Sequence, residues 1–84
     1  MNQRIVFEFL RRPADAPDEW ERVARIVTGV GGELLDDPDA VTGRAPYLFR
    51  ATLPTPEDAE QVVEALRTDP SVGRVDFDTF SFSF

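Results

Sequence analysis

Alternation of apolar and polar residues marks several segments of the chain as strands. In the first of them, Ile5, Phe7 and Phe9 stand two residues apart, so their side chains share one face of an extended segment. Prolines and glycines occur in the stretches between these segments, where turns are needed. The pattern predicts four strands, over Arg4–Leu10, Glu33–Asp36, Tyr47–Leu53 and Val72–Phe84.

Two other segments carry apolar residues three and four positions apart, which is the spacing of one face of a helix. The first spans Pro17–Thr28, and the glycines within Gly29–Gly32 end it. The second begins at Thr55, whose hydroxyl can cap a helix, and ends before Asp69-Pro70. The apolar stripe of this second helix is Ala59, Val62, Val63 and Leu66.

The predicted order of elements is strand, helix, strand, strand, helix, strand. This is the order of the ferredoxin-like, or split βαβ, fold. We therefore expect one α+β domain over residues 1–84, with two helices on one face of a four-stranded antiparallel sheet. The inward strand faces and the helix stripes converge on a predicted core that includes Phe7, Phe49, Val63, Leu66 and Phe77.

The end of the chain is out of phase with this core. If Val75 and Phe77 point inward, strict alternation turns the phenylalanines of the last five residues outward. They would join apolar residues of the first and third strands in a patch that predicts an interface. The predicted interface residues are Val6, Leu10, Leu48, Phe80, Phe82 and Phe84. A β-bulge near Asp78–Thr79, which would return the phenylalanines to the core, is the alternative.

The composition removes most catalytic chemistries. The chain has no cysteine and no histidine, and all nine basic residues are arginine. It therefore lacks thiol nucleophiles, imidazole acid–base groups and Schiff-base lysines, and no glycine-rich loop joins a strand to a helix. The acidic stretch Asp36–Asp39 lacks the ligand spacing of a calcium loop and reads as a solvated turn. We expect no enzyme activity, no metal and no cofactor.

Charge and hydropathy limit the partners. A net charge of −7 opposes binding to nucleic-acid phosphates, and the outward positions of the first and third strands lack the aromatics that RNA-binding sheets use. The sequence has no apolar run long enough to span a membrane, and its first ten residues alternate like a strand rather than a signal peptide. We expect a cytoplasmic protein without nucleic-acid or membrane partners. The expected partner is a second copy of the chain, in a homodimer, or another protein. The sequence neither identifies nor excludes a small-molecule effector.

Arg11 and Arg12 are a candidate anion-binding pair at the end of the first strand. Two guanidinium groups can hold a carboxylate or a phosphate through paired hydrogen bonds. The more ordinary interpretation is that they neutralise nearby acids such as Asp15 and Asp18.

The second half of the chain resembles ACT regulatory domains. The similarity runs from Ala45 through the second helix to Phe77, where Pro70-Ser71-Val72-Gly73-Arg74-Val75 is similar to the family's step from that helix into the last strand. The helix-to-strand step Ile26–Leu35, with its double glycine, is also similar. The resemblance implies a non-catalytic regulatory module whose sheets pair side by side. The segment Arg11–Pro17 lacks the glycine that the family usually carries at its amino-acid effector site.

The same half also resembles the propeptide-type inhibitors of subtilisin-like proteases, which share this topology. That resemblance implies an inhibitor that presents its C-terminal tail to the protease cleft. A self-associating regulatory or interaction module is the leading functional expectation, and such an inhibitor is the alternative.

Overall fold

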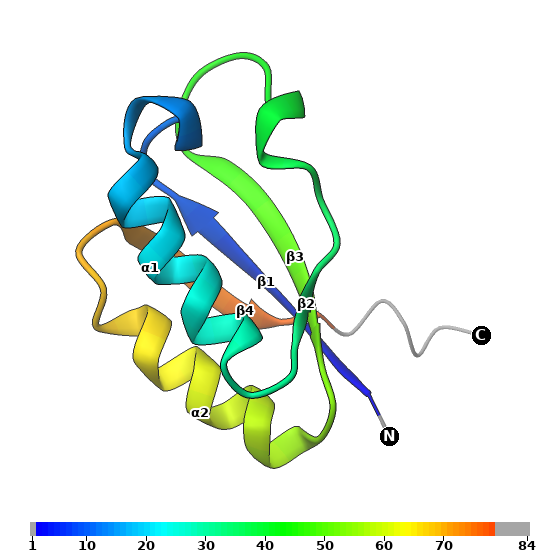
Figure 1. The fold of residues 1–84 in the computed structure, drawn as a ribbon. Coiled ribbons are helices and arrows are strands. Elements are labelled where there is room, and N and C mark those ends of the chain that lie inside the picture. Colours follow the sequence, from blue (N-terminus) through cyan, green and yellow to red (C-terminus); the bar gives the residue numbers. More distant parts are fainter. Residues whose placement is uncertain (1, 79–84) are drawn as a thin grey trace.

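The computed structural model describes residues 2–78 of the chain (Figure 1). Its strands are β1 (Gln3–Phe9), β2 (Glu33–Leu34), β3 (Tyr47–Leu53) and β4 (Val72–Phe77). Its α-helices are α1 (Pro17–Thr28) and α2 (Pro56–Arg67). Short 3-10 helices cover Pro13–Asp15 and Pro38–Ala40 in the connections. The bounds of α1 and β3 agree with those predicted from the sequence.

The four strands form one antiparallel sheet in the order β2-β3-β1-β4. At its centre, Phe7 of β1 stands opposite Phe49 of β3 and Val75 of β4. This order and the alternation of strands and helices confirm the predicted α+β, ferredoxin-like fold.

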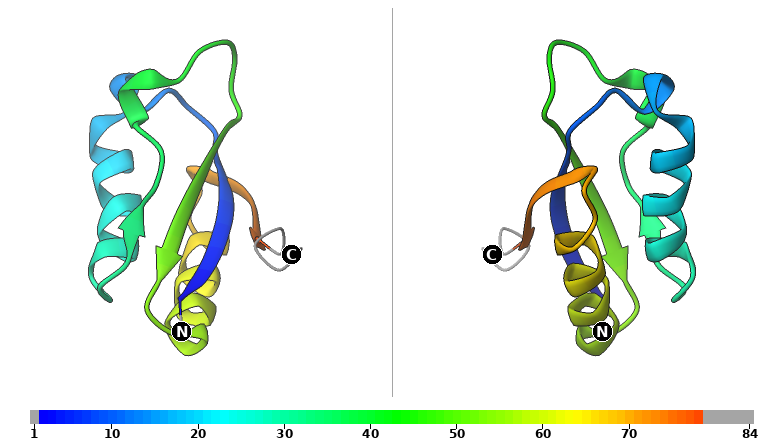
Figure 2. Two further views of the ribbon diagram at one scale, coloured as in Figure 1. Left: turned by 90° about the vertical axis from the view of Figure 1, so that its right-hand side faces the viewer. Right: turned by 90° about the vertical axis from the view of Figure 1, so that its left-hand side faces the viewer.

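Both α-helices pack on the same face of the sheet (Figures 1 and 2). The core lies between the two layers, where Trp20 of α1 packs its ring against three phenylalanines of the sheet. The ring centroids of Trp20 and Phe49 are 4.6 Å apart, a normal separation for an aromatic pair. The fully buried residues of both layers include Ile5, Phe7, Phe9, Val23, Val27, Phe49, Ala51, Ala59 and Leu66.

Both predicted helix signals operate in the structure. The Thr55 side-chain oxygen accepts a hydrogen bond from the Asp58 amide at 3.1 Å, which satisfies one otherwise unpaired N–H group at the start of α2. After α1, Gly31 takes a φ of 85°, a conformation that glycine adopts at little cost. The amide of Gly32 then donates to the carbonyl of Val27, which closes the helix end.

A β-bulge lies within β4 at a position that the sequence did not indicate. The register between β1 and β4 shifts between Phe7 and Phe9, so Val72 and Val75 are both buried although they are three positions apart and not two. The Glu8 carboxylate accepts a hydrogen bond from the Arg74 amide at 3.0 Å. A Cβ on Gly73 would lie 2.9 Å from that carboxylate oxygen, so the bulge fits closely around a glycine. The alternative bulge near Thr79 falls partly outside the described residues.

The predicted burial of Phe77 is wrong, although the face on which it lies was predicted correctly. Phe77 stands opposite Ile5, a core residue, so its side chain is on the helix side of the sheet. It is nevertheless 40% exposed, because β4 is an edge strand and one flank of the ring has no neighbouring strand among residues 2–78. The other predicted core residues, Phe7, Phe49, Val63 and Leu66, are buried.

Candidate interaction surface

The face of the sheet opposite the helices carries two described residues of the predicted interface, Val6 and Leu48. No other element within residues 2–78 covers this side, which we call the open face (Figure 2). Register places Val6 at its centre, between Arg50 of β3 and Asp76 of β4. Its side chains are Arg4, Val6 and Glu8 from β1, Leu48, Arg50 and Thr52 from β3, and Asp76 from β4.

Ion pairs occupy much of the open face. The Arg50 guanidinium donates to the Asp36 carboxylate at 2.9 Å, and the Arg50 backbone amide donates to the same carboxylate at 2.8 Å. These hydrogen bonds hold the pKa of Asp36 below its ordinary value. Asp76 forms a second ion pair, in which its Oδ2 lies 3.2 Å from Nε of Arg74. The charged groups are thus largely partnered within the chain, and the apolar side chains between them have no such partners.

The three described members of the predicted interface differ in exposure. Leu48 is 65% exposed, the highest value among the large apolar side chains of residues 2–78, and Leu10 is 42% exposed. Val6 is only half-buried among its charged neighbours. Leu48 of β3 stands opposite Glu8 of β1, whereas Leu10 follows the end of β1 and its side chain lies close to Gly73 of β4. Phe80, Phe82 and Phe84 lie outside the described residues.

Arg11 and Arg12 lie just beyond the end of β1, and both are exposed. Within residues 2–78 neither guanidinium forms an ion pair, so no direct contact joins them to Asp15 or Asp18. The sequence pattern missed a third arginine at this end. Arg44 precedes β3, and because Tyr47 of β3 stands opposite Phe9 of β1, the connection that carries Arg44 meets the same end of the sheet. Only the strand pairing reveals this proximity.

An open hollow lies beside Arg44. Its lining mixes polar and apolar groups and combines the loop before β3 with the first residues of that strand: Val41, Thr42, Arg44, Pro46, Tyr47 and Leu48. The Tyr47 hydroxyl donates to the Gly43 carbonyl at 2.9 Å and so holds the loop against the strand. The exposed Leu48 therefore borders both the hollow and the open face.

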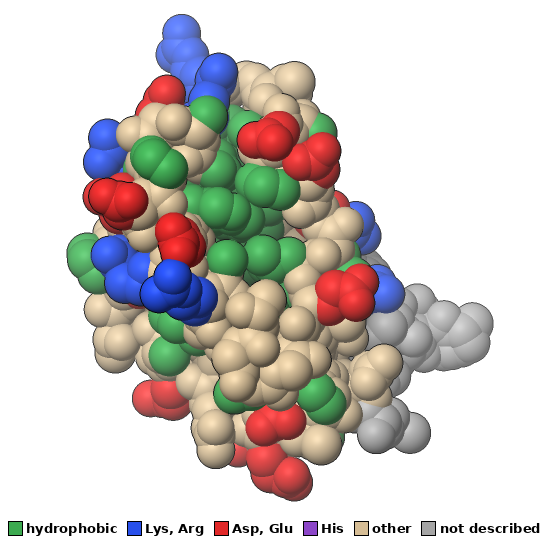
Figure 3. Space-filling view, viewed as in Figure 1, with side chains coloured by type: hydrophobic (Ala, Val, Ile, Leu, Met, Phe, Trp, Pro, Cys, Tyr) green, Lys and Arg blue, Asp and Glu red, His purple; other side chains and the backbone are tan. Residues whose placement is uncertain are grey.

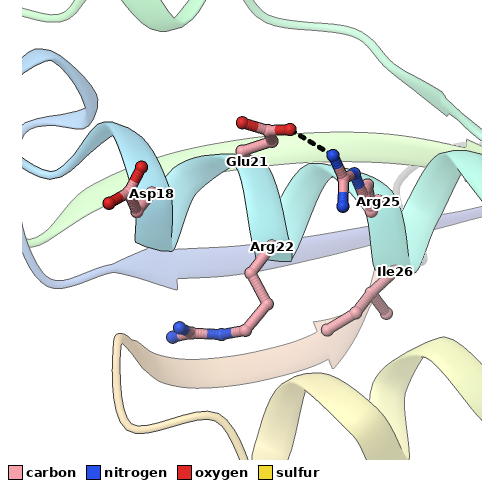
Figure 4. Close-up of a pocket in the computed structure, with 5 residues that line it drawn as sticks. All are labelled: Asp18, Glu21, Arg22, Arg25 and Ile26. Atoms are coloured by element: carbon pink, nitrogen blue, oxygen red, sulfur yellow. Dashed lines mark hydrogen bonds and ion pairs between the residues drawn. The ribbon is translucent and has the colours of Figure 1, made fainter.

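A second hollow runs along α1 and has charged walls (Figure 4). Asp18, Glu21, Arg22, Arg25 and Ile26 line it. Glu21 and Arg25 form an ion pair one helical turn apart, whereas Arg22 points away from them toward β4 (Figure 4).

The Arg22 side chain ties α1 to the connection between α2 and β4. Its guanidinium donates to both carboxylate oxygens of Asp69 at 2.8 Å, and it also reaches the Ser71 hydroxyl at 3.2 Å. The Ser71 amide donates to the same carboxylate at 2.9 Å. The arginine hydrogen bonds are the main cause of a lowered pKa of Asp69. Asp69 therefore stays ionised near neutral pH and is not set up to donate a proton.

Among residues 2–78 no three histidine, cysteine, aspartate or glutamate side chains gather in a way that could hold a metal ion. Asp37 instead accepts a hydrogen bond from the Asp39 amide and caps a short 3-10 helix. No helix in the described part of the chain is long and apolar enough to cross a bilayer. No protein-family model, curated protein sequence or solved structure matches this chain.

Proposed function

We propose that this chain is a non-catalytic regulatory or protein-interaction module that self-associates through the open face of its sheet. The observation that carries the proposal is the exposure of Leu48, at 65%, near the start of β3 on a sheet face that no described element covers. An apolar side chain at such a position is stabilised when a partner removes it from water, at roughly 25 cal/mol per Å² of apolar area.

The charged groups of the open face support a second copy as the partner. Both signs are present side by side, with Arg50 next to Asp36 and Arg74 next to Asp76. A two-fold pairing brings the same patch of both copies together, so a patch of mixed sign can meet opposite charges across the axis. A face of one sign would repel its own copy.

The non-catalytic part of the proposal rests on the carboxylates. Acid–base catalysis by carboxylates needs one group whose pKa is raised toward neutrality. Asp36 and Asp69 have pKa values shifted the other way by their arginines. The hollow on α1 offers charged groups that are already paired, including Arg25 with Glu21 and Arg22 with Asp69.

Sedimentation equilibrium of the full chain at several concentrations tests the proposal. The parent is expected to show a dimer mass that falls on dilution, and Leu48→Ser is expected to remain a folded monomer. The side chain of Leu48 is mostly in solvent, so its replacement costs the isolated subunit little stability.

Phe77→Ser is the matched control. It removes an apolar side chain that is 40% exposed but lies on the helix side of the sheet, so the dimer mass should persist. A parent that remains monomeric at every concentration contradicts the proposal. If Leu48→Ser sediments as a dimer like the parent, the dimer contact lies outside the open face.

A further inference from the structure

The arginines of this acidic chain divide into two groups. Within residues 2–78, five of them form ion pairs: Arg4, Arg22, Arg25, Arg50 and Arg74. The chain has 16 acidic residues for nine arginines, so a scarcity of carboxylates does not explain the unpaired ones. The four that form no ion pair there are Arg11, Arg12, Arg44 and Arg67.

Three of these four gather at one end of the sheet, beyond the pair formed by Phe9 and Tyr47. Arg11 and Arg12 follow β1, and Arg44 lies in the connection that enters β3. All three are exposed. Basic side chains project at this end of the molecule in the space-filling view (Figure 3). Asp15 belongs to the 3-10 helix that follows Arg12, yet it pairs with none of the three.

Apolar surface adjoins one member of this group, Arg44. Arg44 lies on the wall of the open hollow formed with Val41, Pro46 and Leu48. Each guanidinium offers several N–H donors in a planar arrangement that matches a carboxylate. Unpaired arginines next to exposed apolar side chains are also a common composition of protein-binding surfaces.

We propose that Arg11, Arg12, Arg44 and the adjoining hollow form a second interaction surface, which binds a protein segment with carboxylates beside an apolar side chain. The apolar side chain enters the hollow, and the carboxylates accept hydrogen bonds from the three arginines. This surface is distinct from the central open face, although Leu48 borders both.

The charge of the whole chain favours a short acidic segment over a larger polyanion. The net charge of −7 repels nucleic acid and anionic membranes, because each of them carries many negative charges. A segment with one or two carboxylates meets less of this repulsion. A bare phosphate backbone would also leave the apolar side chains of the hollow, Val41, Pro46 and Leu48, without a partner.

The test is a titration of the full chain with a blocked synthetic pentapeptide in which two glutamates flank a leucine. The guanidinium N–H signals of the protein are followed by NMR. We expect saturable shifts at Arg11, Arg12 and Arg44. The combined variant Arg11→Gln, Arg12→Gln, Arg44→Gln should weaken binding by at least about tenfold, since each arginine loses a charge-assisted hydrogen bond.

Arg67→Gln is the control, because Arg67 is also unpaired and exposed but ends α2. It should leave the affinity unchanged, and a peptide with glutamine in place of glutamate should bind poorly. The proposal is overturned if millimolar peptide gives no saturable shifts, or if Arg67→Gln weakens binding equally. It is also overturned if a DNA oligonucleotide or a phosphatidylserine vesicle competes better than the peptide. In sedimentation the triple variant should keep the parent's mass, which separates this surface from self-association.

Discussion

At the scale of single residues, the strand faces were predictable and the local surroundings were not. Phe49 belongs to an alternating strand and is buried, as its position predicts. Phe77 has the same phase but lies at a sheet edge, and only the strand order shows which strands are edges. The partner of Arg22 could not be predicted from the sequence pattern either, because Asp69 is 47 residues away in the chain.

The burial of Phe49 leads to a stability prediction. Phe49→Ala should lower the free energy of unfolding by about 3–5 kcal/mol, because the substitution removes a ring that packs against Phe7 and Trp20 and leaves a cavity. Phe77→Ala should cost much less, since that ring is 40% exposed. Urea unfolding measures both. A loss below about 1 kcal/mol for Phe49→Ala would be inconsistent with its place in the core.

The Arg22–Asp69 contact predicts an acid-sensitive contribution to stability. The folded-state pKa of Asp69 lies below its unfolded value of about 3.9, so the contact stabilises the fold fully above that pH. The contribution is lost as pH falls through the lower folded-state pKa. The stability difference between the parent and Asp69→Asn should therefore shrink in acid. Asp36→Asn removes a different carboxylate with a lowered pKa. Introduced into both proteins, it should leave the stability difference caused by Asp69→Asn, and the pH dependence of that difference, unchanged. A difference that is constant between neutral pH and pH 3 would rule out this linkage.

At the scale of elements, helices were easier to predict than strand ends. The apolar stripes and the Thr55-Pro56 start define α2 with local information alone. Strand β2 was expected to reach Asp36 but ends at Leu34. Beyond that point, the Asp36 side chain takes the place of a backbone carbonyl and accepts a hydrogen bond from the Arg50 amide. The bulge in β4 also depends on a contact distant in sequence, between Glu8 and the Arg74 amide.

The cap of α2 is the most direct element to test. Thr55→Ala should cost about 1 kcal/mol, because the Asp58 amide loses its acceptor at the helix start. Thr55→Ser retains a hydroxyl and should recover most of that loss. Thermal unfolding followed by circular dichroism measures both. Equal stability of the alanine and serine variants would show that the hydrogen bond contributes nothing.

At the scale of the whole molecule, the ferredoxin-like arrangement was predictable from the order of elements, and the surfaces were only partly so. The open face follows from strand phase, which correctly placed Val6 and Leu48 away from the core. Its ion pairs, such as Asp36 with Arg50, depend on three-dimensional proximity. The grouping of Arg44 with Arg11 and Arg12 requires the register between β1 and β3, which no local pattern contains.

The protease-inhibitor alternative has its own test. A self-associating module should leave the activity of subtilisin-like proteases unchanged when added in excess. An inhibitor that inserts its tail would block the protease and lose this effect when Phe82-Ser83-Phe84 is removed. Inhibition that depends on these three residues would favour the alternative.

The phenylalanines beyond Asp78 can be tested through the same self-association. Replacing Phe80 and Phe82 with serine should give a folded monomer if these rings join the interface of Val6, Leu10 and Leu48. Sedimentation at several concentrations measures the change. A dimer that survives this double substitution would remove the phenylalanines from the interface while leaving Leu48 to be tested by its own variant.

Isotope-filtered nuclear Overhauser spectroscopy on a mixture of labelled and unlabelled copies tests the open-face dimer most directly. The signals it detects come only from protons on different copies that lie close together. We expect such signals from the methyl groups of Leu48, Leu10 and Val6, and none from Val23 or Val27, which are buried on the core side of α1. The absence of signals from the Leu48 methyls, at concentrations where sedimentation shows a dimer, would contradict association through the open face.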